Sequence, residues 1–266
     1  EMCIRDRIPR QAHDTDFSRV KPWYLDGKAR FLRQSVLLSA FDTPEFRHLY
    51  GALSNVGGKL RTTPLPPDAQ ASMAEVVPGV RQAFTKFDAG SVQGESDQRL
   101  SAFLQRVLPS LLRSAVSSSH TMIVVPSYFD FVRLEDHFRK SDPVLSYTTL
   151  TEYSSNREVS RAREAFFSGK RDFLLVTERF HFYRRYKIRG AHTVVFYAPP
   201  EHAAYYPEFV NAALDRRSDD EGGVDPADVS ATVLYSKYDL LRLERIVGER
   251  QARQMVTEAR TSWRFA

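Results

Sequence analysis

The chain has 266 residues, of which 42% are hydrophobic, so it can bury one large core or two modest ones. Its formal net charge is +5, and a basic balance of this kind favours an acidic partner such as nucleic acid. The single cysteine, Cys3, excludes an intrachain disulfide and a cysteine-based zinc site, and it indicates a reducing compartment. The longest apolar runs fall far short of the roughly 20 residues of a membrane span.

The first part of the chain predicts little regular structure. Residues 1–7 have neither the apolar core of a signal peptide nor the pattern of a strand, and we expect the sequence to be a fragment whose preceding residues are missing. Residues 33–41 form a short apolar, β-rich run. Asp42 or Thr43 is a candidate N-cap with Pro44 in the first turn, so we predict a strand that leads into a helix.

A connector and an interrupted helix are predicted next. Glycine, proline and serine are frequent from about residue 54 to residue 94, and the apolar stretches there are short. Residues 97–116 carry apolar side chains at helical spacing, interrupted by Pro109. Because proline cannot donate the helical hydrogen bond, we expect a kinked or broken helix.

Strands and helices alternate regularly from residue 121 onward. The apolar runs that indicate strands are 121–126, 172–178, 192–198 and the start of 231–247, and 144–154 is a strand candidate of mixed composition. The helical patterns are 130–140, 156–169 and the rest of 231–247. An acidic, glycine-containing loop is expected over 218–230. Alternation of this kind predicts an α/β fold, with a parallel sheet covered by helices on both faces.

The residues give no sign of catalytic or metal chemistry. No G-x-x-x-x-G-K-[ST] loop for phosphates occurs in these 266 residues, and Ser127 lacks the G-x-S-x-G turn of a hydrolase nucleophile. The histidines are scattered without the spacing of metal ligands. We therefore assign no catalytic residue, no metal and no cofactor.

The segment 174–190, LLVTERFHFYRRYKIRG, combines a strand with a basic and aromatic cluster. Its apolar strand ends at Thr177 and Glu178, where ligands of open parallel sheets usually bind. The cations that follow are Arg179, Arg184, Arg185, Lys187 and Arg189, interleaved with Phe180, Phe182, Tyr183 and Tyr186. Guanidinium groups match phosphate oxygens and aromatic rings stack on bases, so the cluster suits single-stranded RNA or an acidic protein surface. The alternative is a solvated basic loop whose aromatic side chains attach it to the domain.

The helical pattern over 156–169 adds a second basic feature. Arg157, Arg161 and Arg163 are too close together to be explained by core packing. An RNA contact and a solvated helix face both fit this pattern, and the residues alone do not decide between them.

The order of these features resembles the second RecA-like domain of a DEAD-box RNA helicase, preceded by the tail of the first domain. LLSAF (37–41) resembles the S-A-T motif that ends the first domain, and SYFDFVRL (127–134) lies where the first strand and helix of the second domain meet. VTERFHFYRRYKI (176–188) is similar to the stretch from V-A-T-D to R-G-L-D-I, and FYAPPEHAAYY (196–206) to the segment before H-R-I-G-R. The resemblance implies 1–50 as the end of a first RecA-like domain, 51–96 as a connector and 97–266 as the second RecA-like domain.

The sequence departs from the active helicases at the positions that sense nucleotide. Phe41 replaces the threonine of S-A-T, and Arg185 and Lys187 stand at the glycine and aspartate of R-G-L-D-I. Residues 208–212 (Glu-Phe-Val-Asn-Ala) stand where H-R-I-G-R belongs, so both arginines are lost. An arginine finger contributes on the order of 10³ to 10⁵ in the rate of phosphoryl transfer. We therefore expect degenerate ATPase and helicase motifs and no enzyme activity.

A closer resemblance covers nearly the whole chain. The stretches 121–134, 152–163, 174–190 and 233–248 are similar to the digestive organ expansion factor family, also called the U3 small nucleolar RNA-associated protein 25 family. Membership implies a helicase-like protein of the nucleus and nucleolus without helicase activity, acting in the small-subunit processome. The implied partners are pre-ribosomal RNA, the U3 small nucleolar RNA particle and other processome proteins, and the implied role is pre-rRNA processing that leads to 18S rRNA; no membrane partner is expected.

The resemblance also implies roles for single residues. Thr177 matches the position that touches the RNA backbone in active helicases. The helix over 156–169 matches the one that lies beside the RNA path in those helicases, although their Q-x-x-R pattern reads Asn156 to Val159 here. The expected RNA-binding residues are Thr177, Arg179, Arg184, Arg185, Lys187, Arg189, Arg157 and Arg161.

Two other functions compete with the non-catalytic RNA-binding subunit. One is an active ATP-dependent DEAD-box-like RNA helicase whose nucleotide site lies mostly in a missing N-terminal part. The other is a protein-only adaptor that uses Leu240, Leu243, Ile246 and Val247, which share one helical face, to bind a partner. Such a face also fits ordinary core packing.

Overall fold

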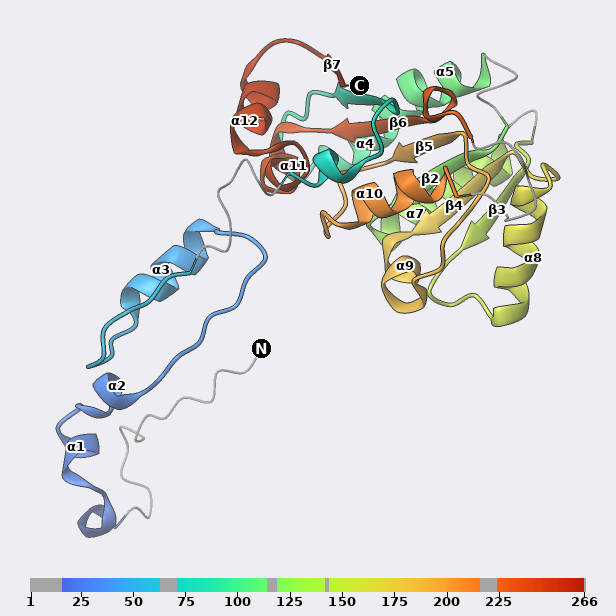
Figure 1. The fold of residues 1–266 in the computed structure, drawn as a ribbon. Helices are drawn as coiled ribbons and strands as arrows, with labels where there is room; N and C mark the ends of the chain where they lie inside the picture. The colour runs from blue at the N-terminus through green and yellow to red at the C-terminus, as the bar shows by residue number, and fades with distance from the viewer. Residues whose placement is uncertain (1–15, 63–70, 114–118, 142–143, 216–223, 266) are drawn as a thin grey trace. The chain divides into compact units, whose positions relative to one another are not determined.

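The computed structural model describes residues 16–62, 71–113, 119–141, 144–215 and 224–265, in two compact units, 1–64 and 65–266 (Figure 1). Cys3, the first seven residues and part of the predicted acidic loop lie outside the described residues.

The first unit contains short helices. They are η1 (Phe17–Arg19), α1 (Pro22–Leu25), α2 (Ala29–Leu32) and α3 (Pro44–Ala52). The prediction of a helix after Asp42 is confirmed, because the Thr43 hydroxyl accepts a hydrogen bond from the backbone N–H of Phe46 at 3.3 Å and Pro44 occupies the first turn.

The predicted strand over 33–41 is wrong. Residues 33–39 have no regular secondary structure, and Leu38 is 90% exposed. A strand needs a hydrogen-bonded neighbour, and the described part of this unit, 16–62, supplies none. A β-rich composition alone therefore does not produce a strand here.

The second unit is built on a seven-stranded sheet. Its strands are β1 (Arg81–Lys86), β2 (Thr121–Val125), β3 (Tyr147–Leu150), β4 (Phe173–Thr177), β5 (Thr193–Phe196), β6 (Ser230–Tyr235) and β7 (Ser262–Phe265). Their order is β3-β4-β2-β5-β6-β1-β7, and every neighbouring pair is parallel except the antiparallel pair of β1 and β7. The parallel strands direct their carboxyl ends to one edge of the sheet.

Helices cover both faces of this sheet (Figure 1). One face packs against α4 (Glu95–Ala102), a π turn (Phe103–Val107), α5 (Leu108–Leu112) and α7 (Tyr128–Lys140). The other packs against α8 (Asn156–Phe167), α9 (Glu178–Arg184), α10 (Tyr205–Ala212), α11 (Leu240–Val247) and α12 (Glu249–Thr257). Because both faces are covered, β2, β4 and β5 are buried along their whole length. The predicted α/β fold with a parallel sheet flanked by helices is confirmed.

The structure also contains strands that the sequence did not predict. β1 lies within the segment expected to be a connector and pairs with β6 on one side and β7 on the other. Its sequence, RQAFTK, has only two fully hydrophobic side chains, so no apolar run announces it. β7 was missed for the same reason.

The predicted break near Pro109 is confirmed, because the π turn at Phe103–Val107 separates α4 from α5.

The apolar face of α11 is part of the core. Leu243, Ile246 and Val247 are buried, and Leu240 packs against them. The second interpretation of this face, ordinary core packing, is therefore confirmed, and these side chains are not available to a protein partner.

Within the ranges that the structure describes, no helix is long and apolar enough to cross a membrane.

Candidate nucleic-acid interface

Helix α9 follows β4 directly, where the sequence suggested a loop. The Thr177 hydroxyl caps this helix by accepting a hydrogen bond from the backbone N–H of Phe180 at 3.2 Å, and it donates to Glu152 Oε2 at 2.9 Å. Thr177 is 1% exposed. Its hydroxyl therefore positions α9 and Glu152, and an RNA contact from this residue would compete with both bonds.

Glu178 joins the ends of two strands. Its carboxylate accepts hydrogen bonds from the backbone N–H groups of Glu201 and His202, both at 3.0 Å, in the segment that follows β5. Burial raises the pKa of the Glu178 carboxyl, and the two N–H donors oppose that shift. Glu178 therefore holds the loop after β5 against α9 and is not free to bind a ligand.

The cations of the segment 179–189 divide into two groups. Arg179 lies 3.6 Å from Glu152, and Arg184 donates to Asn156 Oδ1 at 3.0 Å, so both face β3 and α8. The second group faces α10: Arg185 Nη1 lies 2.7 Å from Glu208 Oε2, and Lys187 Nζ lies 2.8 Å from Asp215 Oδ2. Arg189 has no ion pair within the described residues. The expected single cluster is therefore split, and most of its cations already have a partner.

These surface pairs leave the cations accessible. The side chains of Arg179, Arg185 and Lys187 are more than half exposed. Exposed ion pairs contribute about 0 to 1 kcal/mol each, because water solvates both charges well. A phosphate group can therefore replace these carboxylate partners at small cost.

The three arginines of α8 do not behave alike. Arg163 donates to the backbone carbonyl of Lys187 at 3.2 Å and lies over the ring of Tyr186 at 5.1 Å, so it fixes the segment after α9 to α8. Arg157 and Arg161 are exposed and have no ion pair closer than 4.0 Å among the described residues.

Exposed aromatic side chains line the same edge of the sheet. Phe182 and Tyr183 follow β4 and are 53% and 62% exposed, Tyr153 follows β3 and is 71% exposed, and Phe129 follows β2 and is 83% exposed. Phe182 and Tyr183 were predicted from the sequence, whereas Phe129 and Tyr153 were not. The rule that ligands bind at the carboxyl ends of parallel strands would have found both, because each stands within four residues of a strand end. Their rings offer surfaces on which unpaired bases can stack.

Glu208 is the centre of a partly buried acid–base group. Its Oε2 atom lies 2.6 Å from Nε2 of His181 and 2.7 Å from Nη1 of Arg185. His181 is buried against Phe209 and Tyr205, with ring centroids 4.4 and 4.8 Å away. Burial lowers the pKa of His181, although Glu208 opposes this shift. Because His181 Nδ1 is buried without a hydrogen-bond partner, the neutral ring fits the site better than the protonated ring.

A cavity of about 490 Å³ opens beside this group. It is lined by His181, Arg185 and Lys187 on one side and by Glu208, Asn211 and Asp215 of the α10 region on the other. Two carboxylates face it, which disfavours a bound polyphosphate.

A second acid–base group is buried between α4 and the ends of β5 and β6. The Arg99 guanidinium donates to the backbone carbonyls of Tyr197 and Leu234, each at 3.1 Å, and lies 2.6 Å from Asp239 and in contact with Glu95. Arg99 is only 3% exposed, so this group is structural.

The chain is similar to known proteins along nearly its whole length. The family described as "Utp25, C-terminal domain" matches residues 72–265, and the family described as "UTP25, NTP hydrolase-like domain" matches residues 4–60. A protein from Sclerotinia sclerotiorum named U3 small nucleolar RNA-associated protein 25 is 38% identical over 260 residues, which cover 97% of this chain and 35% of that protein. Protein NUCLEOLAR FACTOR 1 of Arabidopsis thaliana is 38% identical over 261 residues, covering 98% of this chain and 32% of that protein. The chain thus spans about a third of the length of these relatives.

Solved helicase structures align with part of this chain. The E. coli DEAD-box protein SrmB aligns with a TM-score of 0.42 and 15% identity, covering 63% of this chain and 83% of that chain. The C-terminal domain of the DEAD-box protein Dbp5 aligns with a TM-score of 0.42 and 15% identity, covering 59% of this chain and 76% of that chain.

The mostly parallel sheet and the helices on both of its faces define an α/β domain. The chain belongs to the Utp25 family, the same family as the digestive organ expansion factor proteins. The resemblance on which the sequence analysis relied is therefore confirmed.

Proposed function

We propose that this chain is part of a non-catalytic pseudo-helicase subunit of the small-subunit processome. It binds pre-ribosomal RNA and the U3 small nucleolar RNA particle in the nucleolus, contacts other processome proteins and supports the processing that yields 18S rRNA. The names of the relatives support the association with U3 RNA and the nucleolar site. Residues 1–50 serve as the end of a first RecA-like domain, and the rest of that domain belongs to the longer protein.

The observation that carries the non-catalytic role is the environment of Glu208. In the register with the helicases, this residue occupies the start of H-R-I-G-R. The Glu208 carboxylate binds His181 and Arg185, so contacts with these two neighbours hold the acidic side chain in place. Glu208 takes the histidine position of that motif, and the buried Phe209 and Ala212 take its two arginine positions, so no cation there stabilises the charge that develops during phosphoryl transfer.

The support for RNA binding is the combination of charge and aromatic surface at the carboxyl edge. Arg179, Phe182 and Tyr183 lie on the exposed face of α9, and the exposed Tyr153 follows β3. Stacking on an aromatic side chain contributes roughly 1 to 3 kcal/mol per base, and cations next to the rings bind the phosphates. Single-stranded RNA is therefore the ligand that this edge fits best.

The alternative, an active RNA helicase, makes the opposite prediction for ATP. We expect the full-length protein to hydrolyse ATP no faster with pre-ribosomal RNA than without it. A radiolabelled ATP assay measures this directly, and a DEAD-box helicase under the same conditions shows that the assay detects stimulation. Turnover that RNA stimulates would overturn the non-catalytic role and establish the alternative.

A further inference from the structure

Strand β3 leaves one side of its backbone open. It is the terminal strand of the sheet and, within the described residues, pairs with β4 alone. The carbonyl of Ser146 accepts a hydrogen bond from the backbone N–H of Phe173 at 3.0 Å. Because backbone groups alternate in direction along a strand, Thr148 and Leu150 also face β4. The N–H and C=O groups of Tyr147 and Thr149 therefore point away from the sheet.

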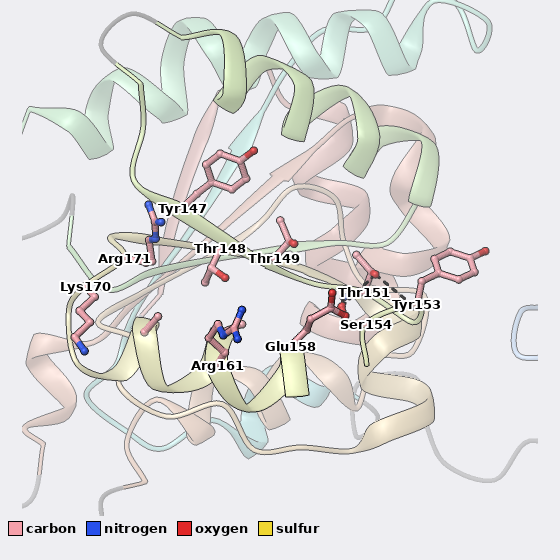
Figure 2. Close-up of a pocket in the computed structure, with 12 residues that line it drawn as sticks. Tyr147, Thr148, Thr149, Thr151, Tyr153, Ser154, Glu158, Arg161, Lys170 and Arg171 are labelled. Carbon is pink, nitrogen blue, oxygen red and sulfur yellow. Dashed lines mark hydrogen bonds between the residues drawn. The ribbon is translucent and has the colours of Figure 1, made fainter. Parts of the chain in front are cut away.

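A groove runs between this open strand and α8 (Figure 2). Its volume is about 650 Å³, and small side chains, Thr148 of β3 with Ala162 and Ala165 of α8, line it. The large apolar residues of α8, Val159 and Phe166, face the core instead. The groove thus has room beside the strand for another extended chain.

The groove is positively charged. Arg161 reaches the middle of the groove from α8, and Lys170 and Arg171 lie at one end of it, on the side of Tyr147 (Figure 2). All three are exposed, and none has an ion pair among the residues that the structure describes. Glu158 is the one acidic residue of the lining, and its Oε2 atom already accepts hydrogen bonds from the N–H and hydroxyl of Ser155, both at 2.8 Å.

The strand also lacks the features that usually protect a sheet edge. Natural edge strands carry lysine, proline or a bulge that prevents pairing with another chain. The four residues of β3, Tyr-Thr-Thr-Leu, contain no charge and no proline, and their pairing with β4 runs without a bulge.

We propose that this groove binds an acidic, extended peptide segment of a partner protein, which adds to the sheet as a strand beside β3. Main-chain hydrogen bonds to Tyr147 and Thr149 hold such a segment. Every second side chain of the segment faces α8, and successive ones are roughly 6.7 Å apart. Acidic residues at these alternate positions reach Lys170 or Arg171 at one end of the groove and Arg161 near its middle (Figure 2). RNA has no row of peptide N–H and C=O groups to match the open edge, so a peptide fits it better. The inference does not depend on the proposed RNA-binding function.

The main test is a backbone substitution with a matched control. Thr149→Pro removes the outward N–H, and a proline that faces outward is tolerated on an edge strand, whereas Thr149→Val keeps the N–H and the shape of the side chain. The probe is a short fluorescent peptide that alternates glutamate with valine. We expect Thr149→Pro to weaken its binding roughly tenfold, which corresponds to about 1.4 kcal/mol, and Thr149→Val to leave it unchanged.

A second pair of variants tests the charge. Arg161→Glu with Lys170→Glu should weaken peptide binding on the order of tenfold at low salt and less at high salt. The control is Arg250→Glu with Arg264→Glu. Both arginines are exposed, Arg250 on α12 and Arg264 on β7 at the opposite edge of the sheet, so the control should not change peptide binding. Thermal unfolding of each variant shows whether the fold is intact.

Amide hydrogen exchange locates the bound peptide. The amides of Tyr147 and Thr149 should gain protection when the peptide binds, whereas that of Thr148, already bonded to β4, should change little. The proposal is overturned if the peptide does not bind, if Thr149→Pro and Thr149→Val bind it equally, or if the same peptide with lysine in place of glutamate binds as well. It is also overturned if an oligouridylate displaces the peptide and loses affinity with the Arg161→Glu, Lys170→Glu pair, because the groove then belongs to RNA.

Discussion

Two of the arginine–carboxylate groups in the second unit differ sharply in burial. Arg99 is almost completely enclosed, with Asp239, Glu95 and two strand carbonyls around it. Arg185 pairs with Glu208 at 2.7 Å, yet its side chain is 56% exposed. Both arrangements look alike as contacts. The buried group has no alternative partner and must be structural, whereas the exposed one can exchange its carboxylate for a phosphate or another acidic group.

Removal of Arg99 should have the largest effect on stability. Arg99→Ala leaves Asp239 and Glu95 without their cation and two strand carbonyls without a donor, so we expect a loss of about 3 to 5 kcal/mol in the free energy of unfolding. Arg106→Ala, at an exposed position seven residues further on, is the control and should change it by less than about 0.5 kcal/mol. Chemical denaturation measures both. Equal effects would mean that the buried group is not structural.

The cap of α9 should contribute less. Thr177→Val keeps the shape of the side chain but removes the hydroxyl that binds Phe180 N–H and Glu152, so we expect a loss of about 1 to 2 kcal/mol. Thr148→Val, a half-buried threonine whose hydroxyl makes no hydrogen bond among the described residues, is the matched control and should be close to neutral. If Thr177→Val were as stable as wild type while RNA binding fell, the hydroxyl would serve RNA and not the helix.

His181 should make stability depend on pH. Burial lowers its pKa below the ordinary value of 6.5, so the unfolded chain binds the proton more tightly than the folded one. The contribution of His181 is complete above pH 6.5 and is lost as the pH falls from 6.5 toward the lowered pKa, with a slope of at most about 1.4 kcal/mol per pH unit.

The variant His181→Phe isolates this effect, because Glu178 and the other titrating groups are present in both proteins. The stability of wild type relative to His181→Phe should therefore decrease as the pH is lowered through this window. A relative stability that increases on acidification would mean that Glu208 dominates and that the folded ring is protonated.

The smallest effect concerns the backbone at Arg185. This residue ends α9 in the left-handed conformation, with φ of 51°, which glycine adopts without strain. Arg185→Gly and Arg185→Ala both lose the pair with Glu208, so their difference reports the backbone alone. We expect the glycine variant to be more stable by about 1 kcal/mol in thermal or chemical unfolding. An alanine variant of equal stability would show that the left-handed turn costs nothing.

The sequence predicted the elements whose signal is local. β2, β4 and β5 are continuous apolar runs because both faces of the sheet are covered, and Thr43 and Pro44 mark the start of α3. β1 and β7 were missed because neither carries an apolar run and their pairing depends on residues far away in the chain. The strand prediction for residues 33–41 was wrong for the opposite reason. Their composition suits a strand, but the described residues provide no neighbouring strand for them to pair with.

The site shows the same division. The cations of 179–189 and the aromatic residues among them were visible in the sequence. Their partners were not, because Arg185 and Glu208 are 23 residues apart and Lys187 and Asp215 are 28 apart. Only the packing of α9 against α10 brings them together. The sequence therefore identified the basic segment but could not show that most of its charges are already paired.

The salt dependence of RNA binding tests the proposed RNA-binding role of the cations in 179–189 most directly. Affinity of this chain for a single-stranded oligouridylate is measured at several salt concentrations, with the triple variant of Arg184, Arg185 and Lys187 to alanine. The control variant changes Arg250, Arg253 and Arg264, of α12 and β7, to alanine.

Each lost phosphate contact lowers the slope of log affinity against log salt by roughly 0.7, so we expect a decrease of about 2 for the triple variant and none for the control. An unchanged slope in the triple variant would contradict the proposal and leave these cations as partners of the acidic side chains beside them.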